Sequence, residues 1–153
     1  MKIGIIGGGI GGSAAAYALL LKGHAVTIFE QAPAFGEVGA GVQMTPNVVK
    51  AIKGLGLYDT FMESGFFPKA IVGRNWQTAQ ENFRIDLGEE FQAHYDAPYV
   101  HIHRADLLDL FASRMPPECC RFKAKCTGVE LIENGARATF EDGSSFEADL
   151  IVG

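Results

Sequence analysis

The sequence predicts an α/β fold that begins with a parallel βαβ unit and ends with antiparallel strands. Three observations lead to this prediction. An apolar, strand-like run at residues 2–6 precedes a glycine-rich loop and an Ala- and Leu-rich run at residues 12–22. A second strand-like run follows at residues 25–29. Near the end, Asn134-Gly135 and Asp142-Gly143 separate alternating segments, and both dipeptides are strong hairpin signals.

The opening unit reads as a buried strand, a helix and a second strand. Gly23 follows the apolar run directly, and glycine is the usual residue just beyond a helix C-terminus. The second strand then ends at Glu30. We expect a right-handed crossover between the two strands, as in nearly all units of this type.

The middle of the chain reads as a glycine-spaced loop at residues 36–47 followed by short elements. Pro46 suits the first turn of a helix that Thr45 caps and that ends near Gly54. Further elements are expected as a helix at 57–63, paired strands at 70–76 and 82–88, and a strand at 99–103.

The last third of the chain is expected to hold one helix and then one antiparallel meander that runs to residue 153. The helix, at residues 105–115, places Leu107, Leu108, Phe111 and Met115 on one face, and Pro116-Pro117 ends it.

Composition excludes several classes of protein. The 153 residues suit one domain with a real core, and a net charge of −5 without a Lys/Arg run argues against a nucleic-acid surface. Three cysteines without a CxxC pair favour a reducing compartment, so a cytoplasmic location is expected. Glycines interrupt the N-terminal apolar stretch, which disfavours a signal peptide, and we expect no membrane span.

The spacing Gly7-x-Gly9-x-x-Gly12 matches the dinucleotide-binding fingerprint. The first glycine permits the tight turn, the second lets a pyrophosphate approach the backbone, and the third lets helix and strand pack closely. The helix N-terminus then presents N–H groups to the phosphates, and Ile10 lies in this predicted contact region. The alternative is a glycine-rich turn that binds nothing.

Glu30 lies 18 residues beyond Gly12, at the end of the second strand, where an acidic residue can accept hydrogen bonds from a ribose diol. Its charge would repel a 2′-phosphate, which disfavours NADP at this site. We also expect the adjacent Gln31 to contact the cofactor. The fingerprint does not separate NAD from FAD, because both contain ADP.

Two longer segments resemble a known family. EQAPAFGEVGAGVQMTPNVVKAIKGLGL (residues 30–57) and HRADLLDLF (103–111) are similar to segments of single-component FAD-dependent aromatic hydroxylases (group A flavoprotein monooxygenases), the group that contains salicylate hydroxylase and 3-hydroxybenzoate 6-hydroxylase. The resemblance implies that residues 1–153 are the N-terminal part of a Rossmann-like FAD-binding domain with an antiparallel β-meander, and that about residues 70–100 contribute to a substrate-side sheet.

The resemblance also implies roles for single residues. Gly7, Gly9 and Gly12 would hold the FAD pyrophosphate, and Glu30 the adenosine ribose. The other implied contacts are Gly41 and Val42 with the ribityl and flavin region, Arg104 with the phosphate or ribityl part, and Cys126 with the adenine.

Gln43 would lie near substrate or flavin. Relatives that hydroxylate 6-hydroxynicotinate have a histidine there as a proposed base, and a glutamine is no base near neutral pH. A phenolic carboxylate is therefore the favoured substrate class. No catalytic residue is assigned, and no metal is expected, because His101 and His103 form only a pair.

The implied reaction is hydroxylation of a small aromatic substrate with O2, by way of a flavin C4a-hydroperoxide after NADH or NADPH reduces FAD. We expect the full-length enzyme to form a homodimer, and the 153 residues alone, as an N-terminal fragment, to be inactive. Two alternatives stay open: an NAD- or FAD-dependent dehydrogenase, and a non-catalytic dinucleotide-binding module.

Overall fold

The computed structural model describes residues 1–36 and 39–153, which form two compact units. The first unit contains the described residues of 1–38 and 107–153, and the second contains residues 39–106. The boundary falls within α5 (Arg104–Ala112). Residues 37 and 38 of the predicted glycine-spaced loop lie outside the described residues.

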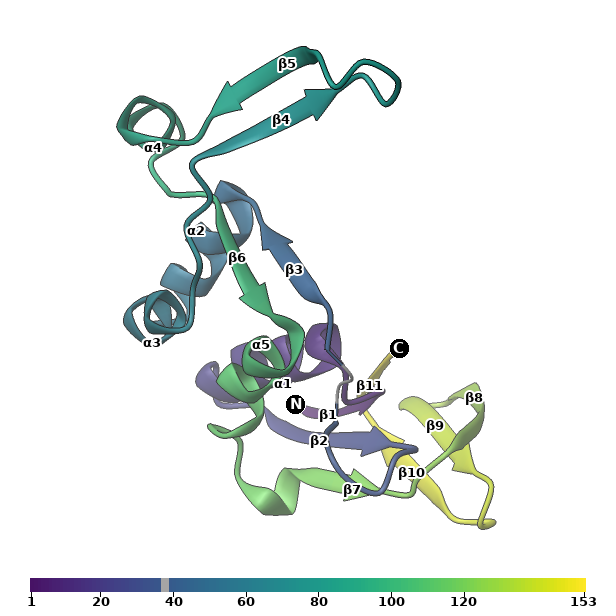
Figure 1. Cartoon of the computed structure of the whole chain (residues 1–153). Helices are drawn as coiled ribbons and strands as arrows, with labels where there is room; N and C mark the ends of the chain where they lie inside the picture. The colour runs from purple at the N-terminus through teal and green to yellow at the C-terminus, as the bar shows by residue number, and fades with distance from the viewer. Residues whose placement is uncertain (37–38) are drawn as a thin grey trace. The chain divides into compact units, whose positions relative to one another are not determined.

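The first unit is built on a four-stranded parallel sheet. Its strands are β1 (Lys2–Ile6), β2 (Ala25–Glu30), β7 (Cys120–Phe122) and β11 (Leu150–Val152), in the spatial order β11-β1-β2-β7. Counted along the chain this order is 4-1-2-3, which is the core of the doubly wound dinucleotide-binding fold. The helix α1 (Ile10–Leu21) connects β1 to β2 and lies beside the sheet (Figure 1). The predicted α/β fold class is confirmed.

Both ends of α1 follow from glycine. The helix begins at Ile10, two residues before the prediction, because Gly9 already serves as its N-cap. At the other end Gly23 has a φ of 78°, its N–H bonds to the carbonyl of Leu20, and the N–H of His24 bonds to that of Leu19. This pair of bonds is a Schellman motif, and glycine supplies the left-handed residue that the motif needs.

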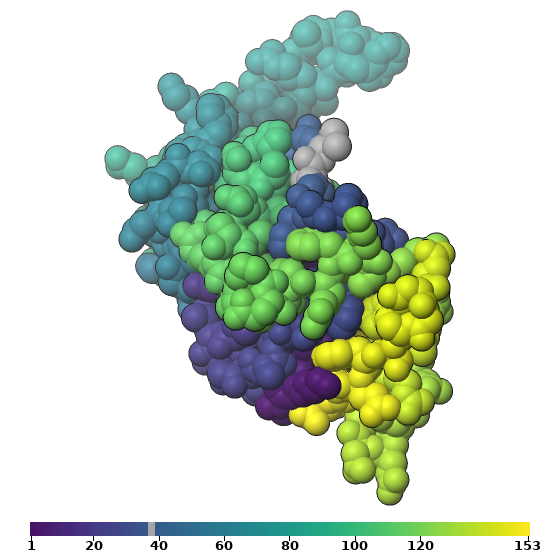
Figure 2. All heavy atoms as spheres, turned by 90° about the horizontal axis from the view of Figure 1, so that it is seen from below, coloured from purple at the N-terminus to yellow at the C-terminus, as the bar shows by residue number. Residues whose placement is uncertain are grey.

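The core of the first unit fills both faces of its sheet. Ile3, Ile5 and Ile28 are almost fully buried against Ala16 of α1. On the other face Phe29 stacks on Phe140, with ring centroids 4.5 Å apart. In Figure 2 the C-terminal strands, in yellow, pack directly against the N-terminal residues, in purple.

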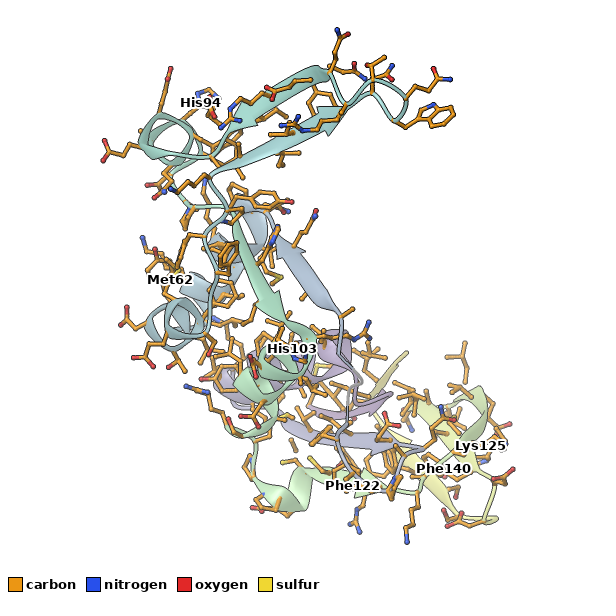
Figure 3. The ribbon with its side chains drawn as sticks, viewed as in Figure 1. Met62, His94, His103, Phe122, Lys125 and Phe140 are labelled. Carbon is orange, nitrogen blue, oxygen red and sulfur yellow. The ribbon has the colours of Figure 1, made fainter. Side chains whose placement is uncertain are left out.

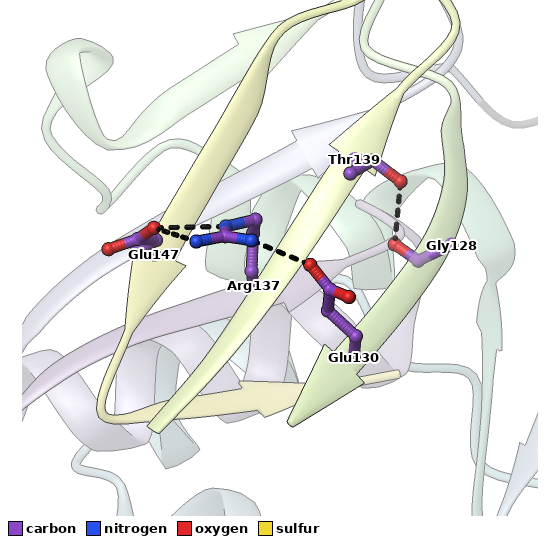
Figure 4. Close-up of polar contacts among 5 residues, drawn as sticks. All are labelled: Gly128, Glu130, Arg137, Thr139 and Glu147. Carbon is purple, nitrogen blue, oxygen red and sulfur yellow. Dashed lines mark hydrogen bonds and ion pairs between the residues drawn. The ribbon is translucent and has the colours of Figure 1, made fainter. Parts of the chain in front are cut away.

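The antiparallel meander consists of β8 (Cys126–Ile132), β9 (Gly135–Phe140) and β10 (Ser145–Ala148). Its outer face carries an ion-pair ladder in which Arg137 donates to Glu130 and to Glu147, each at 2.7 Å (Figure 4). Beside it the hydroxyl of Thr139 donates to the carbonyl of Gly128. The predicted hairpins are present, but their turns lie at residues 133–134 and 141–144, because Gly135 already pairs with Ile132.

The prediction of one meander to residue 153 is wrong for the last strand. Residues 150–152 leave the meander and pair in parallel with β1. The change occurs at Asp149, whose N–H donates to the carbonyl of Lys2 while its carboxylate accepts from the N–H of Lys2 at 2.7 Å. These two contacts redirect the chain into the first sheet.

The second unit contains two small antiparallel sheets and three helices. β3 (Gly41–Met44) pairs with β6 (Val100–His103), and β4 (Ala70–Arg74) pairs with β5 (Glu81–Asp86), as the sequence predicts for 70–76 and 82–88. The helices are α2 (Pro46–Gly54), α3 (Tyr58–Glu63) and α4 (Glu89–Tyr95). Thr45 is the N-cap of α2, but its hydroxyl donates to the side chain of Asn47 rather than accepting from the helix.

One predicted helix needs correction, and two helical elements were not predicted. The helix predicted at 105–115 ends at Ala112, although Met115 is buried as expected. The helix α4, which is short and has no buried residue, was not predicted. The 3₁₀ turn η1 (Pro117–Cys119), which leads into β7, was not predicted either. Within the described residues, no helix is long and apolar enough to cross a membrane.

A steric test follows from the contact between α1 and β1. A Cβ on Gly12 would lie less than 3.0 Å from the carbonyl oxygen of Gly7, whereas a Cβ on Gly11 meets nothing within 4 Å. We expect Gly12→Ala to destabilise the protein by at least about 2 kcal/mol. Gly11→Ala, the matched control, should be neutral or stabilise it by up to about 1 kcal/mol. Urea unfolding of both variants measures this, and equal stabilities would contradict the close approach.

Candidate functional site

The glycine loop connects the end of β1 to the start of α1 through backbone contacts. Gly7 has a φ of 102°, a value that favours glycine, and its N–H donates to the carbonyl of Phe29 at 2.8 Å. The buried hydroxyl of Ser13 donates to the carbonyl of Gly8 at 3.1 Å. The loop is therefore fixed to β2 on one side and to α1 on the other.

Glu30 is held with both carboxylate oxygens engaged. One oxygen accepts from the N–H of Gly8 at 2.7 Å, and the other accepts from the N–H of Ala32 at 2.8 Å. A carboxylate has about four lone-pair positions, so each oxygen keeps acceptor capacity for another donor. The two backbone bonds fix the direction in which that capacity points.

The start of α1 has the features of an anion site. Its N-cap, Gly9, provides no side-chain cap, and the first turn contains no acidic residue. A Cβ on Gly9 would meet nothing within 4 Å, so no contact within the described residues requires glycine there. The first N–H groups of a helix lack partners within the helix and attract anions. A bound anion at this position would explain why the helix has no side-chain cap and why residue 9 is a glycine.

A hollow of about 190 Å³ lies beside this loop. Four predicted contact residues line it together: Gly7, Glu30, Gln31 and Cys126. Its other walls include Phe29 and Ala124, which were not predicted. Ala124 reaches the hollow because its N–H donates to the carbonyl of Glu30, 94 positions away.

Lys125 also lines this hollow and lies near Phe140 (Figure 3). Its ammonium donates to Glu141 at 2.8 Å, and this hydrogen bond raises the pKa of Lys125. The ion pair ties the lysine to the meander side of the hollow. Lys125 and the first residue of β8, Cys126, therefore line the hollow together with Glu30.

The second unit brings together the other predicted cofactor residues. Gly41 is opposite His103 in the β3–β6 pair, Val42 is opposite Ile102, and the N–H of Arg104 donates to the carbonyl of Ala40 at 3.0 Å. A Cβ on Gly41 would meet nothing within 4 Å. Gln43 follows on β3, and its side-chain oxygen accepts a hydrogen bond from the hydroxyl of Tyr99 at 2.7 Å.

An apolar pocket of about 490 Å³ also lies within the second unit, and we call it the hairpin pocket. It is lined by the β4–β5 hairpin, by α4 and by the start of α2, with Tyr99 on one wall. The main apolar contributors are Ile71, Ile85, Leu87, Phe91 and Tyr95. Ile71 and Ile85 are directly opposite each other in the hairpin, so one face of the hairpin is apolar.

The histidines and cysteines occupy separate places. His94 lies on α4 and His103 at the end of β6 (Figure 3), and no group of three candidate metal ligands occurs in the described part of the chain. Burial raises the pKa of the Cys119 and Cys120 thiols, so both stay protonated at neutral pH and are weak nucleophiles.

Comparison with known proteins supports the resemblance found in the sequence. A family model described as an NAD(P)-binding Rossmann-like domain matches residues 5–49. The chain is 36% identical over 152 residues to 6-hydroxynicotinate 3-monooxygenase of Bordetella bronchiseptica and 40% identical over 152 residues to a 3-amino-4-hydroxybenzoate 2-monooxygenase of Streptomyces platensis. It is 36% identical to salicylate hydroxylase of Pseudomonas putida. These matches cover 99–100% of this chain but only 35–40% of each relative.

Solved structures agree with these matches. A variant of Klebsiella pneumoniae HpxO complexed with FAD superimposes with a TM-score of 0.86 at 26% identity, over 99% of this chain and 38% of that one. A tetrameric form of 2-methyl-3-hydroxypyridine-5-carboxylic acid oxygenase, at 24% identity and a TM-score of 0.82, has the same fold over 99% of this chain and 38% of its own. The resemblance to FAD-dependent aromatic hydroxylases is thus confirmed along both units.

Because a Cβ on Gly9 would meet no other atom within 4 Å, a substitution there can test ligand binding without disturbing the fold. The backbone of Gly9, with φ −69° and ψ −175°, is one that alanine adopts readily. We expect Gly9→Ala to change stability by less than about 1 kcal/mol. It should weaken FAD binding at least tenfold, because the new methyl group would occupy the space of a phosphate. Gly54→Ala, at another glycine with open space, is the control, and unchanged FAD affinity in Gly9→Ala would refute the phosphate site.

The carboxylate of Glu30 can be tested by an isosteric change. Glu30→Gln keeps the shape but replaces one acceptor with an NH2 group that faces a backbone N–H. Since hydrogen bonds to charged groups contribute about 1.5–3 kcal/mol, FAD and ADP should each bind about tenfold or more weakly. Calorimetric titration measures both ligands, with the exposed Glu133→Gln as control. A loss for FAD without a loss for ADP would place the carboxylate away from the adenosine ribose.

Proposed function

We propose that the whole protein containing this chain is an FAD-dependent monooxygenase that hydroxylates a small aromatic substrate with O2 and NADH or NADPH. The observation that carries the proposal is the match to aromatic hydroxylases over 99–100% of the chain, both units included. A dinucleotide fingerprint alone would fit many enzymes, because it requires only part of the first unit. The chain spans about 40% of the length of the relatives it matches.

The residues present fit FAD. Glu30, fixed by Gly8 and Ala32, would accept hydrogen bonds from the adenosine ribose, and the start of α1 would bind the pyrophosphate through Gly7, Gly9, Ile10 and Gly12. Gln31 and Cys126 would line the adenosine side of the hollow. The two backbone bonds that hold the carboxylate of Glu30 support this arrangement.

In the second unit, Gly41 and Val42 would lie along the ribityl and flavin part, and the Arg104 guanidinium would bind a phosphate or ribityl oxygen. When bound, FAD supplies the redox chemistry, taking a hydride from NADH or NADPH and activating O2. The chain's own residues would bind and orient this group and shield it from water. The repulsion between Glu30 and a 2′-phosphate applies to the FAD site alone. It therefore does not indicate whether NADH or NADPH is the reductant.

The relatives and the hairpin pocket support the proposed substrate class. The names of the relatives specify hydroxynicotinate, aminohydroxybenzoate and salicylate, which are all small aromatic acids. The pocket walls of Ile71, Ile85, Leu87 and Phe91 suit a planar apolar ring. We therefore propose a phenolic carboxylate-like substrate and a contribution of residues 70–100 to the substrate side.

The remaining expectations are also proposals. Cys119, Cys120 and Cys126 are free thiols, which supports a cytoplasmic location. A homodimer of the full-length enzyme stays a prediction, and one solved structure of the same fold is described as a tetrameric form.

The full-length protein can be tested directly. We expect it to purify with a flavin absorption spectrum and to oxidise NADH or NADPH in the presence of one or more hydroxybenzoates, with O2 uptake and a product heavier by one oxygen atom. Mass spectrometry of the product and an oxygen electrode measure this. Reversible NAD binding in a colourless protein would favour a dehydrogenase instead. Bound dinucleotide without O2 uptake for any substrate would favour a non-catalytic module.

A further inference from the structure

One side-chain hydrogen bond in the second unit joins a buried residue to an exposed one. Tyr99 is only 7% exposed, its ring lines the hairpin pocket, and its hydroxyl donates to the side-chain oxygen of Gln43 at 2.7 Å. Gln43 is exposed on β3. The Tyr99 hydroxyl therefore joins a residue that lines the pocket to the exposed amide of Gln43, at hydrogen-bond distance.

The neighbouring strand restricts this amide further. Gln43 is directly opposite His101 in the β3–β6 pair, and the rings of Tyr99 and His101 meet edge to face with centroids 5.7 Å apart. Tyr99 and His101 are two positions apart, so their side chains lie on the same face as that of Gln43. Met44 and Val100 lie on the other face and are buried. Their burial fixes which face of the β3–β6 pair carries Gln43.

The direction of the hydrogen bond determines what the amide can offer. Because the oxygen of Gln43 accepts from Tyr99, the NH2 group is the part left to face another molecule, and it can only donate. An amide does not ionise near neutral pH, so this group can orient an acceptor but cannot remove a proton. Lys50, on another wall of the same pocket, adds a positive charge.

We propose that Gln43 determines specificity by donating a hydrogen bond to a carboxylate or phenolate oxygen of the aromatic substrate, and that Tyr99 is a positioning residue that fixes the direction of the amide. This inference rests on the proposed function and names the group that recognises its substrate. Without the Tyr99 hydroxyl, the amide of Gln43 can rotate and present its oxygen to the substrate oxygen, which is repulsive.

The test measures dissociation constants in the full-length FAD-bound protein by calorimetry. The probes are the hydroxybenzoate that the wild type binds most tightly and the matching hydroxybenzamide, whose amide has no charge and contains an NH2 donor. Tyr99→Phe should raise the Kd of the hydroxybenzoate about two- to tenfold, the range expected for loss of one hydrogen bond. Gln43→Glu should shift the preference toward the hydroxybenzamide by tenfold or more, because it replaces the donor with a charged acceptor.

A double-mutant cycle distinguishes positioning from a general effect on folding. In the wild-type background, Tyr99→Phe should act on KM more than on kcat. In the Gln43→Leu background it should have no further effect on the Kd. Tyr58→Phe, which removes a hydroxyl from α3, is the matched control and should leave the Kd within twofold. Thermal unfolding of each variant identifies any that fails to fold.

Additive effects of the two substitutions, or an unchanged preference in Gln43→Glu, would overturn this inference while the proposed function stands. A wild-type protein that contains FAD but binds no hydroxybenzoate would instead overturn the proposed substrate class, and this inference with it. A protein without FAD would overturn the proposed function itself.

Discussion

The close approach of α1 to β1 is the constraint on which the rest of the first unit depends. The carbonyl of Gly7 occupies the position that a side chain on residue 12 would need, so the helix can start immediately above the strand end only with glycine there. Because Gly7 also bonds to the carbonyl of Phe29, the loop is fixed to β2 one residue before Glu30. The carboxylate of Glu30 then reaches the N–H of Gly8 without any change in the backbone. The start of the helix and the position of the Glu30 carboxylate thus both depend on this packing contact.

Local signals in the sequence predicted much of the fold, whereas pairing over long distances could not be predicted. The βαβ unit, the β4–β5 hairpin and the end of α1 at Gly23 each depend on residues close together in the chain. The parallel pairing of β11 with β1 depends on Asp149 meeting Lys2, and no pattern within residues 145–153 indicates that partner. A strand's alternation tells which residues share a face, but it does not tell which strand lies beside it.

The same division applies to the candidate site. Gly7, Gly9, Gly12 and Glu30 could be identified because their spacing is itself the signal. Cys126 was identified only through the resemblance, and it lines the same hollow as Glu30. The contact between Tyr99 and Gln43 could not be predicted, because it requires β3 and β6 to pair although 56 positions separate the two side chains. Their spacing along the chain has no meaning until the strands are aligned.

The two units must therefore differ in what they determine about the reaction. In the proposed site the first unit would bind ADP, which is common to NAD and FAD, so these contacts would not select the chemistry. Under the same proposal the selection would fall to the second unit, where strand pairing directs the polar groups and the pocket walls are apolar. Since an amide does not ionise near physiological pH, Gln43 would donate to a substrate oxygen in the proposed site but could not remove its proton. Under the proposed function, the electron density of the bound ring would then depend on the ionisation of the substrate itself.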